Sequence, residues 1–234
     1  MMIDAENSGG QLDPGLMELR ANLYSIVELA LIRSGITADR YVSEDRGDGI
    51  LALVDAGVPK IDLVDPLMDH LDAGLRQHNH DNPLDGWLRL RIALHSGEVR
   101  RDAKGWGARD LTLTFRLSQA EAVKRCLVLA ARAQCVLVTS DSFYRSVIAH
   151  GDRSIDPATY RSVDIAQPGG LTKAWLHVPG YHVPPLGAAP PGTAPDLAMS
   201  APNGSVVYAP GRDFNDLRNG GVVNNYSGPP GDHR

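Results

Sequence analysis

The amino-acid sequence predicts an α+β sandwich, in which helices cover one face of a mixed β-sheet. Leucines recur every three or four residues in two stretches, which is the spacing of an apolar stripe along a helix. Apolar and polar residues alternate from Leu88 to His95, as in a strand with one buried face. A Gly47-Asp48-Gly49 turn separates the runs YVSED and ILALV, which indicates a β-hairpin.

The expected elements mix helices with strands along the chain. The first helix carries an apolar stripe from Leu16 to Ala30, with Asp13 as its N-cap, Pro14 as its first residue and Gly35 at its end. The other expected elements are, in chain order, the hairpin at 41–54, a helix at 63–75, a strand at 88–95, a helix at 111–132, a strand from residue 135, a helix at 142–150 and strands at 163–166 and 172–178.

The composition is ordinary for a globular protein and excludes several classes of partner. The 234 residues are 43% hydrophobic and 22% charged, enough for one core and a tail. A formal net charge of -5 provides no basic field for nucleic acid or an anionic membrane. Cys126 and Cys135 are too few for a disulfide framework, so we expect reduced core thiols. With neither a signal peptide nor a long apolar run, we expect a cytoplasmic protein that does not enter a membrane.

The chain changes character near residue 180, which predicts three segments. Residues 1–180 hold all the periodic stretches and form the expected folded domain. Residues 181–202 are rich in proline, glycine and alanine, as in an extended linker. In the segment 203–228, the block NGSVV recurs as NGGVV. Two β-prone blocks of this kind could stack as rungs of a cross-β unit, and the alternative is a disordered tail whose repeat is accidental.

Two carboxylates follow short apolar runs. Asp4 ends the stretch Met1-Met2-Ile3, and Asp48 lies in the hairpin turn. Carboxylates at the ends of adjacent strands can hold Mg²⁺ or Mn²⁺, although a Gly-Asp-Gly sequence is by itself ordinary turn chemistry. Because only three residues precede Asp4, we expect either a short first strand or a translation start upstream of Met1.

Taken in order, six segments resemble the class III nucleotidyl (adenylate/guanylate) cyclases, particularly a group common in high-GC Gram-positive bacteria. These segments, which lie within residues 1–180, are MIDAENSG, DRGDGILALV, LRLRIALHSGEV, RDLTLTFRLSQA, SDSFYRSVIAHGDRSIDPATY and AWLHVPG. The resemblance implies a ferredoxin-like nucleotide-cyclase sandwich, a homodimer, a nucleoside triphosphate substrate and bound Mg²⁺ or Mn²⁺. It assigns the metal to Asp4 and Asp48.

Other family positions are only partly kept in this chain. Arg116 matches an arginine that stabilises the transferring phosphates, a task suited to its fixed, charged donor fork. Thr112 stands where the family has an asparagine that orients the ribose, and Glu44 stands where it has a purine-selecting lysine. Ala108 replaces a glycine before the same helix. Since losing one preorganised contact costs a factor of about 10²–10³ in rate, these changes predict an impaired catalytic site.

Arg89 and Arg91 lie on the polar face of the strand at 88–95, together with His95. We assign the two arginines to nucleotide binding, in a cleft that this face would line. The alternative is a strand face that is solvated or covered by a second subunit, because such alternation is normal in half-buried strands.

Three functions therefore remain open for the chain. The first is a degenerate cyclase-like domain that passes a signal through the C-terminal motif, which resembles the amyloid signalling motifs of bacterial immune-type proteins and would recruit a partner with a matching motif. The second is an active nucleotide cyclase of altered base specificity, in which Glu44 contacts a different base. The third is an unrelated α+β domain in which the motifs coincide by chance.

Overall fold

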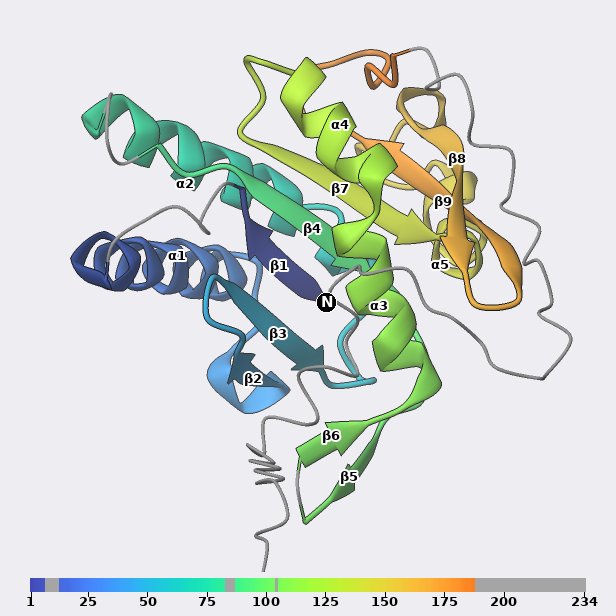
Figure 1. Cartoon of the computed structure of the whole chain (residues 1–234), viewed down its shortest axis with the longest axis horizontal. Helices are drawn as coiled ribbons and strands as arrows, with labels where there is room; N and C mark the ends of the chain where they lie inside the picture. Colours follow the sequence, from blue (N-terminus) through green and yellow to red (C-terminus); the bar gives the residue numbers. More distant parts are fainter. Residues whose placement is uncertain (7–12, 83–86, 104, 188–234) are drawn as a thin grey trace, which may run out of the picture. The chain divides into compact units, whose positions relative to one another are not determined.

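A computed structural model describes residues 1–6, 13–82, 87–103 and 105–187 of the chain (Figure 1). Its centre is a seven-stranded sheet of order β2-β3-β1-β4-β7-β9-β8. β4 and β7 are parallel, and the other neighbouring strands are antiparallel. The expected α+β class with a mixed sheet is therefore confirmed. The elements are β1 (Met2–Ala5), α1 (Asp13–Arg33), β2 (Tyr41–Asp45), β3 (Gly49–Val54), α2 (Leu67–Asp81), β4 (Leu90–Leu94), β5 (Arg100–Asp102), β6 (Gly105–Gly107), α3 (Arg109–Gln119), α4 (Glu121–Leu129), β7 (Cys135–Ser140), α5 (Asp141–Ser146), β8 (Arg161–Gln167) and β9 (Gly170–His177).

One face of the sheet packs against α1 and α2. Alternate residues of the central strands, such as Ile3 of β1 and Ile92 of β4, point into this layer and are completely buried. They meet Leu23 of α1 and the leucines Leu71 and Leu75 of α2. The helical spacing of these leucines places them on one side of each helix, which is why the two helices can lie side by side on the sheet.

The second face carries a separate apolar core beneath α3 and α4. Met2 of β1, Ala93 of β4 and Val138 of β7 point to this face and pack with Leu117 of α3 and Leu127 of α4. Figure 1 shows both helices crossing the sheet on this side. Helices thus cover both faces, and not one face alone as the sequence predicted. The central strands are consequently buried on both sides, so their polar side chains need partners within the protein.

The hairpin of β2 and β3 forms at the predicted turn. Gly47 has φ +78°, a conformation that favours glycine. At Gly49 a Cβ atom would lie 2.6 Å from the carbonyl oxygen of Ile3, so a glycine is needed where β3 approaches β1. The amide of Ala5 donates a hydrogen bond to the carbonyl oxygen of Asp48, at 3.0 Å. These contacts bring the turn to the end of β1.

Two parts of the fold differ from the predicted elements. The helix expected at 111–132 is two helices, because Ala120 takes an extended conformation with φ −60° and ψ 138°. The small sheet of β5 and β6 was not predicted, since strands of three residues show no useful periodicity. By contrast, Gly35 follows α1 with φ +76° as a helix-ending glycine, and Cys126 and Cys135 are free and buried, as predicted.

The described chain continues past residue 180 along α4. Tyr181 and Leu186 pack against the second core, and Arg125 of α4 donates a hydrogen bond to the carbonyl oxygen of Leu186, at 3.0 Å. The first residues of the expected linker therefore belong to the folded unit. The rest of the expected linker and the repeated blocks at 203–228 lie outside the described residues. No helix in the described part of the chain is long and apolar enough to span a bilayer.

Candidate functional site

The end of β1 brings Asp4 to the second face of the sheet, next to Arg91 of β4. Asp4 is 3% exposed and Arg91 is 9% exposed. The two residues are directly opposite each other in the antiparallel pair of β1 and β4. The Nε and Nη2 groups of Arg91 both donate to Oδ2 of Asp4, the first at 2.8 Å. Asp4, predicted to bind the metal, and Arg91, predicted to bind the nucleotide, thus form one buried ion pair.

Several groups set the protonation of Asp4. Burial raises the pKa of this carboxyl group above its usual value, and the charge of Asp48 raises it further. The guanidinium of Arg91 and a hydrogen bond from Gln119 of α3 oppose this shift in pKa. The interaction with Asp48 shows that the second predicted metal ligand lies close enough to act on Asp4. The backbone contact between Ala5 and Asp48, at 3.0 Å, likewise holds the hairpin turn at the end of β1.

Glu44 of β2 is bound by an arginine that sequence reasoning missed. Nη2 of Arg46 donates to a carboxylate oxygen of Glu44 at 2.6 Å, and the guanidinium lies 5.3 Å from the ring centre of Phe115 of α3. The negative charge of Glu44 is therefore paired beside the hairpin. The spacing of two residues along a strand was the available signal, because it places Glu44 and Arg46 on the same side.

The residues predicted on α3 are engaged by neighbours in the same chain. The hydroxyl of Thr112 donates to the carbonyl oxygen of Ala108 at 3.2 Å, within the first turn of the helix. Nη1 of Arg116 donates to Oε1 of Gln167, at the end of β8, at 3.5 Å. Ala108 has φ −172°, an extended conformation open to any residue, so its backbone does not require the family's glycine.

Arg89 fills a structural position at the end of α4. Its guanidinium donates to the carbonyl oxygens of Ala133 at 3.0 Å, of Ala130 at 2.9 Å and of Leu127. It also pairs with Glu6 at 3.0 Å, and both side chains are largely buried. A cation at the carboxyl end of a helix satisfies carbonyl groups that have no partner within the helix. The structure therefore places Arg89 beneath α4 and Arg91 beside Asp4, and both strand arginines have partners inside the subunit.

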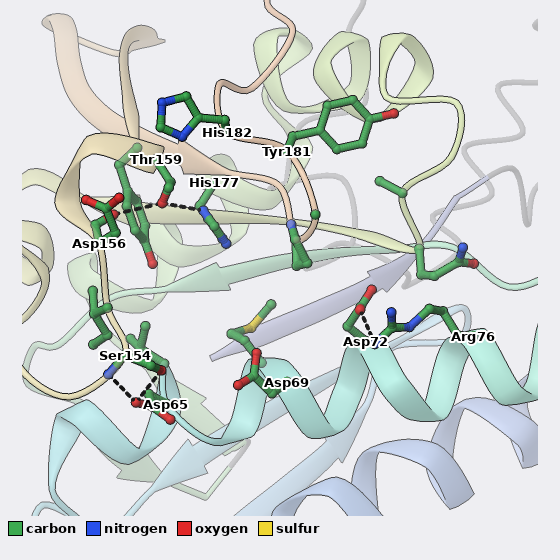
Figure 2. A pocket seen from close by; sticks show the side chains of 18 of the residues that line it. Asp65, Asp69, Asp72, Arg76, Ser154, Asp156, Thr159, His177, Tyr181 and His182 are labelled. Carbon is green, nitrogen blue, oxygen red and sulfur yellow. Dashed lines mark hydrogen bonds and ion pairs between the residues drawn. The ribbon is translucent and has the colours of Figure 1, made fainter.

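A cavity of about 800 Å³ lies away from Asp4 and Arg91, between α2 and the segments 154–160 and 177–182. In Figure 2, Asp69 and Asp72 of α2 face it from one side and His177 of β9 from the other. Nδ1 of His177 lies 3.0 Å from the hydroxyl of Thr159, and burial lowers the pKa of this histidine. None of the residues predicted for the functional site lines this cavity.

No protein-family model and no curated protein sequence matches the chain. Three solved structures align with most of it. The guanylyl cyclase Cya2 has 16% sequence identity and a TM-score of 0.49, over 80% of this chain and 94% of Cya2. The catalytic core of a rhodopsin-guanylyl cyclase with converted specificity, in complex with ATPαS, has 16% identity and a TM-score of 0.49, over 76% of this chain and 91% of that one. The guanylate cyclase domain of RhGC from Catenaria anguillulae, in complex with GTP, has 13% identity and a TM-score of 0.43, over 76% of this chain and 92% of that one.

Because every one of these TM-scores is below 0.5, the fold class rests on the sheet and helices described above. The functional interpretation rests likewise on the residues of this chain.

The position of Arg89 makes a prediction about stability. Replacing Arg89 with Met should lower the free energy of unfolding by about 3 kcal/mol, because buried carbonyls lose their donor and Glu6 loses its cation. Urea denaturation followed by circular dichroism measures this difference. The exposed Arg161 of β8, replaced in the same way, is the control and should change stability by less than about 0.5 kcal/mol. Equal midpoints for the two variants would contradict the assigned role.

Proposed function

We propose that residues 1–180 form a class III nucleotide cyclase-like signalling domain with an impaired active site. The observation that carries this proposal is that the hairpin turn with Asp48 lies at the end of β1, where its carbonyl oxygen accepts the amide of Ala5 at 3.0 Å, next to Asp4. Gln119 places the end of α3 of the same chain against Asp4. Thr112 and Arg116 of this helix would face the carboxylates of a second copy of the chain. The order of the sequence motifs supports the same function.

The donor set suits Mg²⁺ or Mn²⁺ when a triphosphate is also bound. Carboxylate oxygens are the ligands that these ions prefer, and Asp4 and Asp48 supply them from adjacent strand ends. Within the described residues, no group of three or more histidine, cysteine, aspartate or glutamate side chains gathers as a metal site. Phosphate oxygens would therefore complete the coordination, and the bound ion would neutralise charge on the phosphates. Arg91 fixes Asp4 and favours its ionised form.

The impairment follows from how the other site residues are engaged. The hydroxyl of Thr112 has one proton, which it donates to Ala108, so it can offer a ribose only an acceptor. An asparagine amide would offer donors as well. The position that selects a purine in the family carries the carboxylate of Glu44 instead of an ammonium donor. This carboxylate is paired with Arg46.

One contact favours the second function, an active cyclase with a different base preference. The pair of Glu44 and Arg46 presents an acceptor and donors side by side, at about one third exposure. A base edge that combines a donor and an acceptor is complementary to such a pair. The substrate would then be a nucleoside triphosphate other than the usual purine substrate.

We also propose that the domain works as a homodimer. On the second face of the sheet, the part formed by β2 and β3 keeps apolar surface exposed, with Val42 at 49% exposure. Leu53 and Phe115 are only partly buried in the adjoining core. A second copy of the chain laid on this surface would bury these side chains and bring its own α3 toward the carboxylate site.

The first test of this proposal is metal-dependent binding. Replacing Asp48 with Ala should weaken binding of Mn²⁺ with a non-hydrolysable triphosphate by at least about tenfold, because one of two carboxylate ligands is lost. Isothermal titration calorimetry measures the affinity. Asp164→Ala, an exposed carboxylate on β8, is the matched control and should bind as the wild type does. Since the pKa of Asp4 is raised, binding should weaken as the pH falls through that pKa. Equal binding by Asp48→Ala would remove Asp48 from the site.

The second test is turnover of ATP, GTP, CTP and UTP with Mn²⁺. The wild type should form cyclic nucleotide slowly or not at all, and Thr112→Asn should raise the rate by about 10–100-fold, because it restores an amide that orients the ribose. Thr112→Val, which removes the hydroxyl without adding an amide, should give no increase. Rapid turnover of one triphosphate by the wild type would reject the impairment and establish the alternative function.

The C-terminal blocks NGSVV and NGGVV support a second part of the proposal, in which the domain is coupled to an assembly motif at 203–228 in a bacterial immune-type signalling system. Arg212 and Arg218 balance Asp213 and Asp216 in this segment, so stacking would meet little repulsion between like charges. Paired valines in each block supply β-branched faces for a dry interface. A partner protein would carry a matching motif.

The test of the motif is fibril formation by the full chain. The wild type should form β-rich fibrils that bind thioflavin T, whereas Val207→Lys with Val223→Lys should not, because the substitutions place charge in the dry interface. The unfolding transition of the folded unit should be the same in both proteins. A wild type that stays unassembled at high concentration, alone and with seeds of candidate partners, would identify the segment as a plain tail.

A further inference from the structure

A cavity of about 390 Å³ lies at the edge of the sheet where β3 and β4 end. One wall comes from β3 and the loop after it, with Leu53 and Val58. The opposite wall comes from the start of α3, with Asp110 and Leu111, and from His95 just after β4. Asp4, Asp48, Thr112 and Arg116 do not line this cavity, so it is separate from the carboxylate site.

His95 brings a buried polar atom to the cavity wall. Its side chain is 8% exposed, and its Nδ1 lies 2.8 Å from the hydroxyl of Ser140. That hydroxyl also accepts the amide of Phe143 and so caps α5. Nε2 of His95 makes no hydrogen bond with any residue that the structure describes. A buried ring nitrogen whose nearest polar neighbour is beyond good hydrogen-bond distance keeps its hydrogen-bonding capacity for a ligand.

Asp110 stands beside that nitrogen. Its Oδ1 is 3.4 Å from Nε2 of His95, and its Oδ2 accepts the amide of Glu98 at 2.8 Å. A Cβ atom on residue 97 would lie 2.2 Å from Oδ2, so Gly97 is what allows the carboxylate to be seated there. The nearby carboxylate favours the tautomer with the proton on Nε2, and the Ser140 hydroxyl then donates to Nδ1. The wall thus presents an N–H donor next to a carboxylate acceptor.

We propose that this cavity binds a small, flat, uncharged molecule that carries a carboxamide or the equivalent edge of a nucleobase. The carbonyl oxygen of the ligand would accept from Nε2 of His95, and its N–H would donate to Oδ1 of Asp110. Leu53, Leu111 and Phe143 would cover the ring with apolar surface. The volume holds a molecule of one or two rings. A carboxylate ligand is disfavoured, because it would face Asp110. The site does not depend on the proposed cyclase activity, since Asp4, Asp48, Glu44, Thr112 and Arg116 are not part of it.

The experiment is a titration of the full chain with benzamide, benzoate and toluene, followed by the NMR signals of the His95 ring and the Gly97 amide. Benzamide matches both polar groups, benzoate lacks the donor, and toluene lacks both. Benzamide should shift these signals saturably and bind about tenfold more tightly than the other two compounds. Free adenine, which has a donor beside an acceptor, should compete with benzamide. Failure of benzamide to shift the signals, or equal affinities for all three compounds, would overturn the proposal.

Three variants separate specific recognition of benzamide from unspecific binding in an apolar cavity. Asp110→Asn keeps the size of the side chain and can still accept the Glu98 amide, but presents an NH₂ donor to the cavity. The ratio of benzamide to benzoate affinity should therefore fall by about tenfold or more, whereas an unchanged ratio would overturn the assigned contact. Val58→Trp, from the loop after β3, narrows the cavity and should abolish binding of both compounds. Asp48→Ala should bind benzamide as the wild type does, and loss of binding there would move the ligand to the carboxylate site.

Discussion

The ion pair of Asp4 and Arg91 is the interaction on which the centre of the structure depends. β1 lies between β3 and β4, and apolar cores cover both faces of these strands. A charge buried there without a partner would cost several kcal/mol, so each residue needs the other. Because the two are cross-strand neighbours, the pair also favours one register of β1 on β4. A slip of β1 by one residue would turn Asp4 into the core beneath α1 and α2 and leave Arg91 without its partner.

The same need for partners explains the character of the candidate site. Arg91 donates to one oxygen of Asp4, Arg46 pairs with Glu44, and the carbonyl oxygen of Ala108 accepts the hydrogen bond of the Thr112 hydroxyl. Each of these groups is already satisfied by the protein, so a nucleotide would replace internal contacts instead of supplying missing ones. The net free energy of nucleotide binding is then small, because each new contact with the nucleotide replaces a contact within the protein. This is the physical basis of the proposed impairment, and it differs from the simple loss of a charged ligand.

The periodicity of the sequence predicted much of the fold, but it could not predict which residues the polar side chains contact. The stripe of α1, the β2–β3 hairpin and the buried strand β7 follow from spacing that local sequence displays. The break at Ala120 has no local signal, since alanine favours helix and no proline or glycine is near. Both helices lie over the central strands, α3 over β1, β4 and β7 and α4 over β4 and β7, and these are long-range contacts that local periodicity does not show. Likewise, alternation placed Arg89 and Arg91 on a polar face, but only the fold shows that α3 and α4 bury it.

α3 contributes residues to both proposed ligand sites. Its first turn contributes Asp110 and Leu111 to the cavity beside His95, and its last residue, Gln119, bonds to Asp4. Between these ends, Leu117 packs without exposure into the second core. A helix held in this way moves as a unit, so a displacement at one end would be felt at the other. Coupling between the proposed sites would require two positions of α3 that the ligands distinguish.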